Sequence, residues 1–90
     1  MARFERTFLI VNTLGLHARA AAQLVQTANR YKAEVHVEKD GSEVNGKSIM
    51  GVLTLAAAKG TEIVVSCEGD DAPAALAALG AIIENGFGEK

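Results

Sequence analysis

Residues 12–20, Asn-Thr-Leu-Gly-Leu-His-Ala-Arg-Ala, join a strand-like run to an alanine-rich helical segment. Gly15 turns the chain, and His17 then stands where the helix is expected to begin, a position that normally carries Ser, Thr, Asp or Asn. Arg19 adds a positive charge where the helix dipole favours acids. Both choices oppose local stability. They are explained together if an anion binds there, because free amides, dipole and guanidinium would converge on it.

Hydrophobic periodicity predicts the elements around this stretch. Strands are expected at residues 4–11, 33–39, 42–44 and 61–68, and helices at about 18–31, from 48 to between 53 and 59, and from the acids at 70 and 71 to a glycine C-cap at 85–86. The order is therefore β-α-β-β-α-β-α, with too few helical residues to cover both faces of a sheet. It predicts one α+β domain over residues 1–90, an open-faced β-sandwich in which three helices cover one face of a four-stranded antiparallel sheet.

The last helix has conventional ends. Asp70 and Asp71 place acids at its start, Pro73 falls in its first turn, and Gly86-Phe87 resembles a glycine C-cap with its following apolar residue. The first helix, which starts near His17, breaks these rules. Departures of this kind are expected at functional sites.

Composition excludes several classes of protein. The formal net charge of −2 argues against a nucleic-acid binder that works by bulk electrostatics. Arg3, Glu5 and Arg6 interrupt the first apolar run, so no signal peptide is expected, and no segment approaches the length of a membrane span. The single cysteine, Cys67, cannot form an internal disulfide, which favours a reducing compartment. We therefore expect a cytoplasmic protein that does not insert into membranes.

His17 is the candidate reactive residue. A lone histidine in a loop is often only a surface residue, but here Gly15 permits close backbone approach, and Ala18 and Ala20 leave space around the ring. A helix N-terminus disfavours the imidazolium, so a neutral, nucleophilic ring is expected. Such a ring can attack phosphorus, and the phosphoryl group would rest on backbone amides and Arg19. This arrangement suits a carrier that holds its phosphoryl group.

Ser48 is expected to cap the second helix, a structural role by itself. The following Ile49 and Met50 could remain exposed as a docking patch, since methionine adapts to several partners. Cys67 lies in phase with the apolar residues of its strand and is expected in the core. The two histidines and the one cysteine match no metal-ligand spacing, so neither a metal site nor a cofactor is expected.

Two motifs, G-L-H-A-R-A at 15–20 and G-K-S-I-M-G-V at 46–52, resemble those of the HPr family, the histidine phosphocarrier proteins of the phosphoenolpyruvate-dependent phosphotransferase system. The resemblance extends along essentially the whole chain. It implies that His17 accepts a phosphoryl group on Nδ1 from Enzyme I and passes it to an EIIA protein, with Arg19 assisting. It also implies that Ser48 is a regulatory phosphorylation site, for which HPr kinase/phosphorylase would be a further partner.

On the same basis, an apolar rim is expected to dock the upstream and downstream partners in turn. Its members would be Leu16, Ile49, Met50 and Leu53. Successive docking on one surface favours small, transient encounters by a monomer.

Two residues of the opening stretch depart from the commoner family pattern. Ala20 stands where proline is usual, and Leu14 stands where many sugar-type members have asparagine. The N-x-L-G-L-H-A-R pattern and the N-G-F ending resemble the nitrogen-related paralogue, NPr, whereas the segment around Ser48 resembles serine-regulated members. A regulatory component that acts by protein interaction rather than sugar uptake therefore remains an alternative.

A different class of function is a small-ligand or RNA-binding module on the open face of the sheet. Sheets that bind RNA usually display stacking aromatic residues. Phe4, Phe8, Tyr31 and Phe87 form no interleaved aromatic and basic strand motif. The sequence thus favours the carrier over this alternative.

Overall fold

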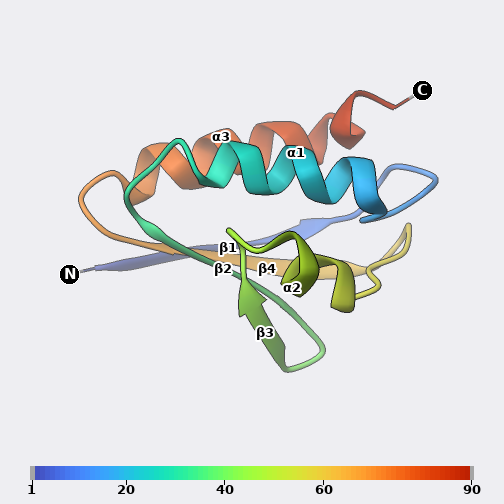
Figure 1. Ribbon diagram of the computed structural model, residues 1–90, viewed down its shortest axis with the longest axis horizontal. Helices are drawn as coiled ribbons and strands as arrows, with labels where there is room; N and C mark the ends of the chain where they lie inside the picture. Colours follow the sequence, from blue (N-terminus) through green and yellow to red (C-terminus); the bar gives the residue numbers. More distant parts are fainter. Residues whose placement is uncertain (1, 90) are drawn as a thin grey trace.

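The computed structural model describes residues 2–89 and contains the predicted order of elements (Figure 1). They are β1 (Arg3–Leu9), α1 (Ala18–Ala28), β2 (Glu34–Lys39), β3 (Ser42–Asn45), α2 (Ile49–Thr54), β4 (Glu62–Glu68) and α3 (Ala72–Glu84), followed by a 3₁₀ turn at Gly86–Gly88. The α+β class and the antiparallel sheet are confirmed. None of the helices within residues 2–89 is long and apolar enough to cross a membrane.

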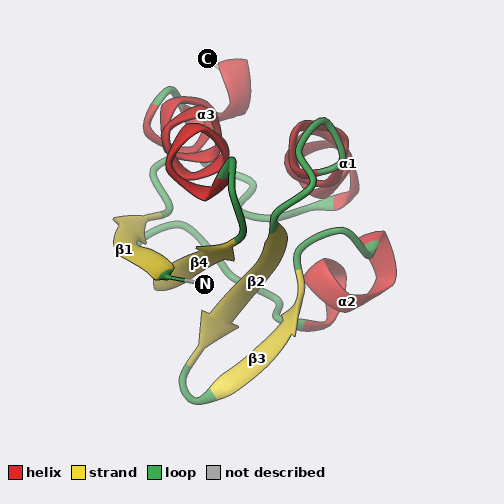
Figure 2. Ribbon diagram, turned by 90° about the vertical axis from the view of Figure 1, so that its left-hand side faces the viewer, coloured by secondary structure: helices red, strands yellow, loops and turns green. Residues whose placement is uncertain are grey.

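The sheet has the strand order β1-β4-β2-β3, and every pairing is antiparallel. β4 is therefore flanked on both sides, and its inward residues Ile63, Val65 and Cys67 are fully buried, as their alternation predicts. α1 and α3 lie side by side over one face, and α2 packs against α1 (Figure 2). Burial raises the pKa of the Cys67 thiol, with a further contribution from nearby Asp71, so this cysteine is an unreactive part of the core.

The opposite face of the sheet is polar. Phe4 and Phe8 are in register with Cys67 and Ile63, so both aromatic residues of β1 lie on the face that the helices cover. On the opposite face, the four strands together carry six carboxylates. They belong to Glu5, Glu34, Glu38, Glu43, Glu62 and Glu68. An acidic face without strand aromatics disfavours the RNA-binding alternative.

Several predicted boundaries shift. α1 ends at Ala28 rather than Tyr31, where Asn29 turns back and its side-chain amide donates to the Val25 carbonyl at 3.0 Å. The second helix ends at Thr54, and Ala56 takes a left-handed conformation with φ of +50°. Local side-chain bonds and one left-handed residue end these helices before the apolar periodicity does.

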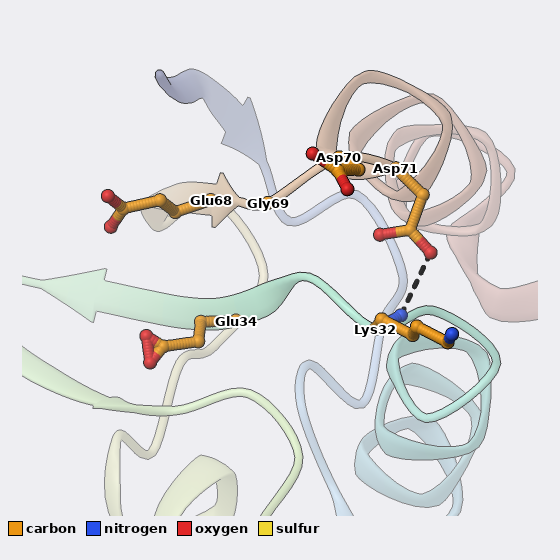
Figure 3. A pocket seen from close by; sticks show the side chains of 6 residues that line it. All are labelled: Lys32, Glu34, Glu68, Gly69, Asp70 and Asp71. Atoms are coloured by element: carbon orange, nitrogen blue, oxygen red, sulfur yellow. Dashed lines mark hydrogen bonds between the residues drawn. The ribbon is translucent and has the colours of Figure 1, made fainter. Parts of the chain in front are cut away.

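The start of α3 lacks the side-chain cap that its acidic residues predicted. Asp71 occupies the N-cap position, but its side chain does not cap its own helix. Instead one carboxylate oxygen accepts from the backbone N–H group of Lys32 at 2.8 Å (Figure 3). The other carboxylate oxygen accepts from the backbone N–H group of Ala33, also at 2.8 Å. The Lys32 amide is the main cause that holds the pKa of Asp71 below its ordinary value. Asp71 thus ties the turn between α1 and β2 to the start of α3.

Replacement of this carboxylate should change the acid stability of the protein. Because the pKa of Asp71 is lowered by folding, its contribution is present above the unfolded value, about 3.9, and is lost as pH falls through the folded value. Asp71→Asn should lower Tm by a few degrees at pH 7, and the difference from wild type should narrow near pH 3. Thermal unfolding followed by circular dichroism measures both. Asp70→Asn, at the neighbouring position, is the control and should match wild type, whereas an equal loss at both pH values for Asp71→Asn would contradict the assignment.

Candidate functional site

His17 occupies the N-cap position of α1, in an extended conformation with φ of −73° and ψ of 179°. Its side chain makes no capping bond to the helix, and the first turn contains no acidic residue. The first-turn amides, which have no partner within the helix, therefore lack a side-chain acceptor from this position. The predicted helix start without a conventional cap is confirmed.

The loop before His17 is held by the loop that follows α2. The Leu16 amide donates to the Ala57 carbonyl at 2.8 Å, and the Gly60 amide donates to the Ile10 carbonyl at 2.8 Å. Gly15 has a φ of +65°, and a Cβ atom at this position would lie 2.4 Å from the Ala57 oxygen. Only glycine satisfies both the left-handed conformation and the close approach.

His17 and Arg19 line the same open depression, of about 550 Å³. The other lining residues are Thr13, Leu14, Gly88 and Glu89. Arg19 is exposed, and none of the ion pairs within residues 2–89 involves it. The structure thus brings the two predicted residues together, with the guanidinium available to an incoming anion.

A second depression has a volume of about 530 Å³ (Figure 3). The segments that line it, the start of β2 and the loop between β4 and α3, lie at the opposite end of the sheet and helices from the start of α1 (Figure 1). Its lining is mostly acidic: Lys32, Glu34, Glu68, Gly69, Asp70 and Asp71. Four carboxylates around one lysine disfavour a phosphoryl group or any other anion. The depression beside His17 is therefore the candidate site. Among the described residues, no group of three or more His, Cys, Asp or Glu side chains is placed to hold a metal ion.

Glu89 is a member of the site that the sequence did not reveal. Its carboxylate contacts Nε2 of the His17 ring, and its other oxygen accepts from the Asn12 side-chain amide at 3.3 Å. The hydrogen bond with His17 is the main cause that lowers the pKa of Glu89, Asn12 adds to it, and partial burial opposes both. The sequence pattern gives no signal for this contact, because it joins residues that are 72 positions apart. The glycines at 86 and 88 have positive φ and turn the chain back toward the loop before α1.

Ser48 caps α2 as predicted, and its hydroxyl oxygen accepts from the Gly51 amide at 3.1 Å. Two of the predicted rim residues are exposed, Ile49 at 42% and Met50 at 73%. Leu53 is half-buried and packs against the core.

Leu16 does not fit the predicted rim. It is only 4% exposed, because the bond between its amide and Ala57 directs this part of the loop toward the core. Leu14, two residues earlier, is 66% exposed and lines the depression beside His17. The surface leucine of this loop is therefore Leu14, and the expectation for Leu16 is corrected.

Comparison with known proteins identifies the family of this chain. Residues 4–85 match the family model for the PTS HPr component phosphorylation site. The chain belongs to the HPr family. An HPr phosphocarrier protein of Neisseria meningitidis is 54% identical over 85 residues, which cover 94% of this chain and 96% of that protein.

Solved HPr structures share the fold. HPr from Thermoanaerobacter tengcongensis superposes with a TM-score of 0.94 at 47% identity, covering 97% of this chain and 98% of that one. A structure described as an HPr dimer from the same organism gives a TM-score of 0.78 at 48% identity, covering 91% and 94% of the two chains. As an HPr-family protein, the chain is a phosphocarrier component of the phosphotransferase system.

The close approach of Gly15 to Ala57 predicts that a side chain at position 15 destabilises this HPr-family protein. Gly60→Ala introduces only left-handed strain, since no atom lies within 4 Å of the added Cβ, and should cost about 1–2 kcal/mol. Gly15→Ala adds a clash with backbone and should cost a further 1–3 kcal/mol or so. Urea denaturation of both variants gives the two free energies of unfolding. Equal losses would show that the loop moves away from Ala57 without penalty.

Proposed function

We propose that this protein accepts a phosphoryl group on His17 Nδ1 from Enzyme I and passes it to an EIIA protein. One observation carries the proposal: His17 stands at the uncapped start of α1, in the same depression as Arg19. The first-turn amides, the helix dipole and the guanidinium would stabilise the charge of a phosphoryl group on the ring. The protein would act as a carrier rather than a catalyst, because the group resides on its own side chain between two partners.

The proposal is tested by incubation with Enzyme I and radiolabelled phosphoenolpyruvate. Wild type should acquire one acid-labile, base-stable label, His17→Ala should acquire none, and Arg19→Ala should be labelled more slowly by about tenfold or more, the scale of one charge-assisted hydrogen bond. The other histidine supplies the control. His36 is on a strand of the open face, so His36→Ala should be labelled like wild type. Label retained by His17→Ala would refute the assignment of the acceptor.

Three exposed apolar residues support a docking surface near this site. Leu14 lines the depression, and Ile49 and Met50 begin α2, which packs against α1. We propose that these residues, together with half-buried Leu53, dock Enzyme I and EIIA in turn. Transient encounters of this kind bury less than about 1,200 Å² in total. A monomer would leave the whole surface free for each partner.

We also propose that Ser48 is a regulatory phosphorylation site, with HPr kinase/phosphorylase as the modifying partner. Its place immediately before Ile49 and Met50 supports this role. A phosphate there would add about −1.5 to −2 charges beside the docking surface and would repel acidic partners. It need not unfold α2, because a helix N-terminus tolerates an anion.

Two substitutions at Ser48 separate its charge effect from its structural role. Ser48→Asp keeps a capping oxygen and adds a charge, so transfer from Enzyme I should slow while Tm stays near wild type. Ser48→Ala removes the cap without adding charge, and should lose about 1 kcal/mol of stability but transfer at the wild-type rate. Transfer kinetics and thermal unfolding of the same samples measure both effects. An unchanged rate for Ser48→Asp would refute the regulatory proposal.

A second candidate is a regulatory, nitrogen-type component of the system. The N-x-L-G-L-H-A-R pattern favours it, and its asparagine, Asn12, is buried and hydrogen-bonded within the site. Parallel transfer assays with sugar-type and nitrogen-type EIIA proteins distinguish the two branches by which acceptor is phosphorylated faster. For either branch we propose the cytoplasm as the location, since Cys67 is a free, buried thiol.

A further inference from the structure

One side of the His17 ring makes a hydrogen bond with the side chain of Glu89. Its Nε2 atom contacts the Glu89 carboxylate, whose side chain is only 17% exposed. The second carboxylate oxygen accepts from Asn12 Nδ2, which also donates to the Gly15 carbonyl at 2.7 Å. Both acceptors face the nitrogen of the Asn12 side-chain amide, which fixes the orientation of the amide group. Ring, carboxylate, amide and loop thus form one connected network.

Packing places Glu89 in this network. The 3₁₀ turn at Gly86–Gly88 follows α3, and Phe87 in its centre is 3% exposed, within the hydrophobic core. Gly86 and Gly88 both have positive φ, which turns the chain back toward the loop before α1. A buried aromatic residue two positions earlier therefore anchors the carboxylate beside His17.

We propose that Glu89 is a positioning residue for phosphoryl transfer: it holds the proton of the His17 ring on Nε2 and thereby leaves the Nδ1 lone pair free to attack phosphorus. The proposal rests on the proposed function. An ionised carboxylate only accepts hydrogen bonds, so the ring nitrogen that faces it must be the donor. Lowering of the pKa of Glu89 keeps the carboxylate ionised at neutral pH.

Phosphoryl transfer to Nδ1 does not require the His17 ring to gain or lose a proton. The Nδ1 lone pair forms the new N–P bond while the bond between phosphorus and the donor atom of phosphorylated Enzyme I breaks, and that electron pair returns to the donor atom. The His17 ring keeps its Nε2 proton and becomes positively charged. The facing Glu89 carboxylate stabilises this charge as it develops, so their interaction is stronger in the transition state than before it. In transfer to EIIA the same steps run in reverse, and the ring returns to neutral.

The test combines kinetics with nitrogen NMR on the full chain. Glu89→Gln keeps the size of the side chain but removes its charge, and should slow phosphoryl transfer from Enzyme I on the order of tenfold. Glu84→Gln is the matched control, because Glu84 is an exposed carboxylate near the same end of the chain and pairs with Arg6 at 3.6 Å. It should transfer at the wild-type rate. Thermal unfolding verifies that each variant is folded.

Histidine labelled with ¹⁵N reads the ring directly, without any phosphoryl donor. In wild type at neutral to mildly alkaline pH, His17 should show a protonated Nε2 with slow proton exchange, and in Glu89→Gln this exchange should become fast. His36 gives the internal reference. A proton on Nδ1 in wild type, or a rate for Glu89→Gln equal to or above wild type, would overturn the inference. Failure of wild type to be phosphorylated would instead sink the proposed function, and the NMR result would still decide whether Glu89 holds the ring.

Discussion

The hydrogen bond from the Leu16 amide to the Ala57 carbonyl, 2.8 Å long, sets the geometry of the end of the molecule that carries His17. It joins the loop before α1 to the loop after α2, and Gly15 lies so close to Ala57 that an added Cβ atom would lie 2.4 Å from the Ala57 oxygen. With Leu16 held in the core, the next residue, His17, emerges at the surface and α1 begins immediately after it. The position of the imidazole is therefore a property of backbone packing between two loops, and a side chain added at Gly15 would displace it.

Charge is distributed unevenly along the molecule, and this matters more than the net charge of −2. The open face of the sheet and the depression near Asp71 are acidic, whereas the start of α1 carries Arg19, free amides and the positive end of a helix dipole. An anionic group is repelled by these acidic regions and attracted to the start of α1. A small, acidic protein can thus present a selective anion site without a large basic patch.

Local patterns in the sequence predicted what depends on local structure. The alternation of Ile63, Val65 and Cys67 predicted the buried face of β4, and the residue at the start of α1 predicted a helix without a side-chain cap. Contacts between distant segments could not be predicted in this way. Burial of Leu16 depends on Ala57, the carboxylate of Asp71 serves amides 38 and 39 residues away, and Glu89 reaches His17 across 72 positions. Each of these contacts depends on tertiary packing, which a periodic pattern does not encode.

The three helices differ in what the side chain of the N-cap residue bonds to. At α2 the Ser48 hydroxyl accepts a hydrogen bond from the Gly51 amide in the first turn of the same helix. At α3 the Asp71 carboxylate instead accepts from the backbone amides of Lys32 and Ala33, in the turn between α1 and β2. At α1 the N-cap side chain bonds to Glu89 instead of to the helix, which forgoes the roughly 1 kcal/mol that a conventional cap contributes. A phosphoryl group on Nδ1 of that same side chain would bring acceptor oxygens to the amides that His17 leaves unbonded. Under the proposed function, the transferred group itself would complete the helix start, and Glu89 would occupy the Nε2 side of the ring so that only Nδ1 could receive the phosphoryl group.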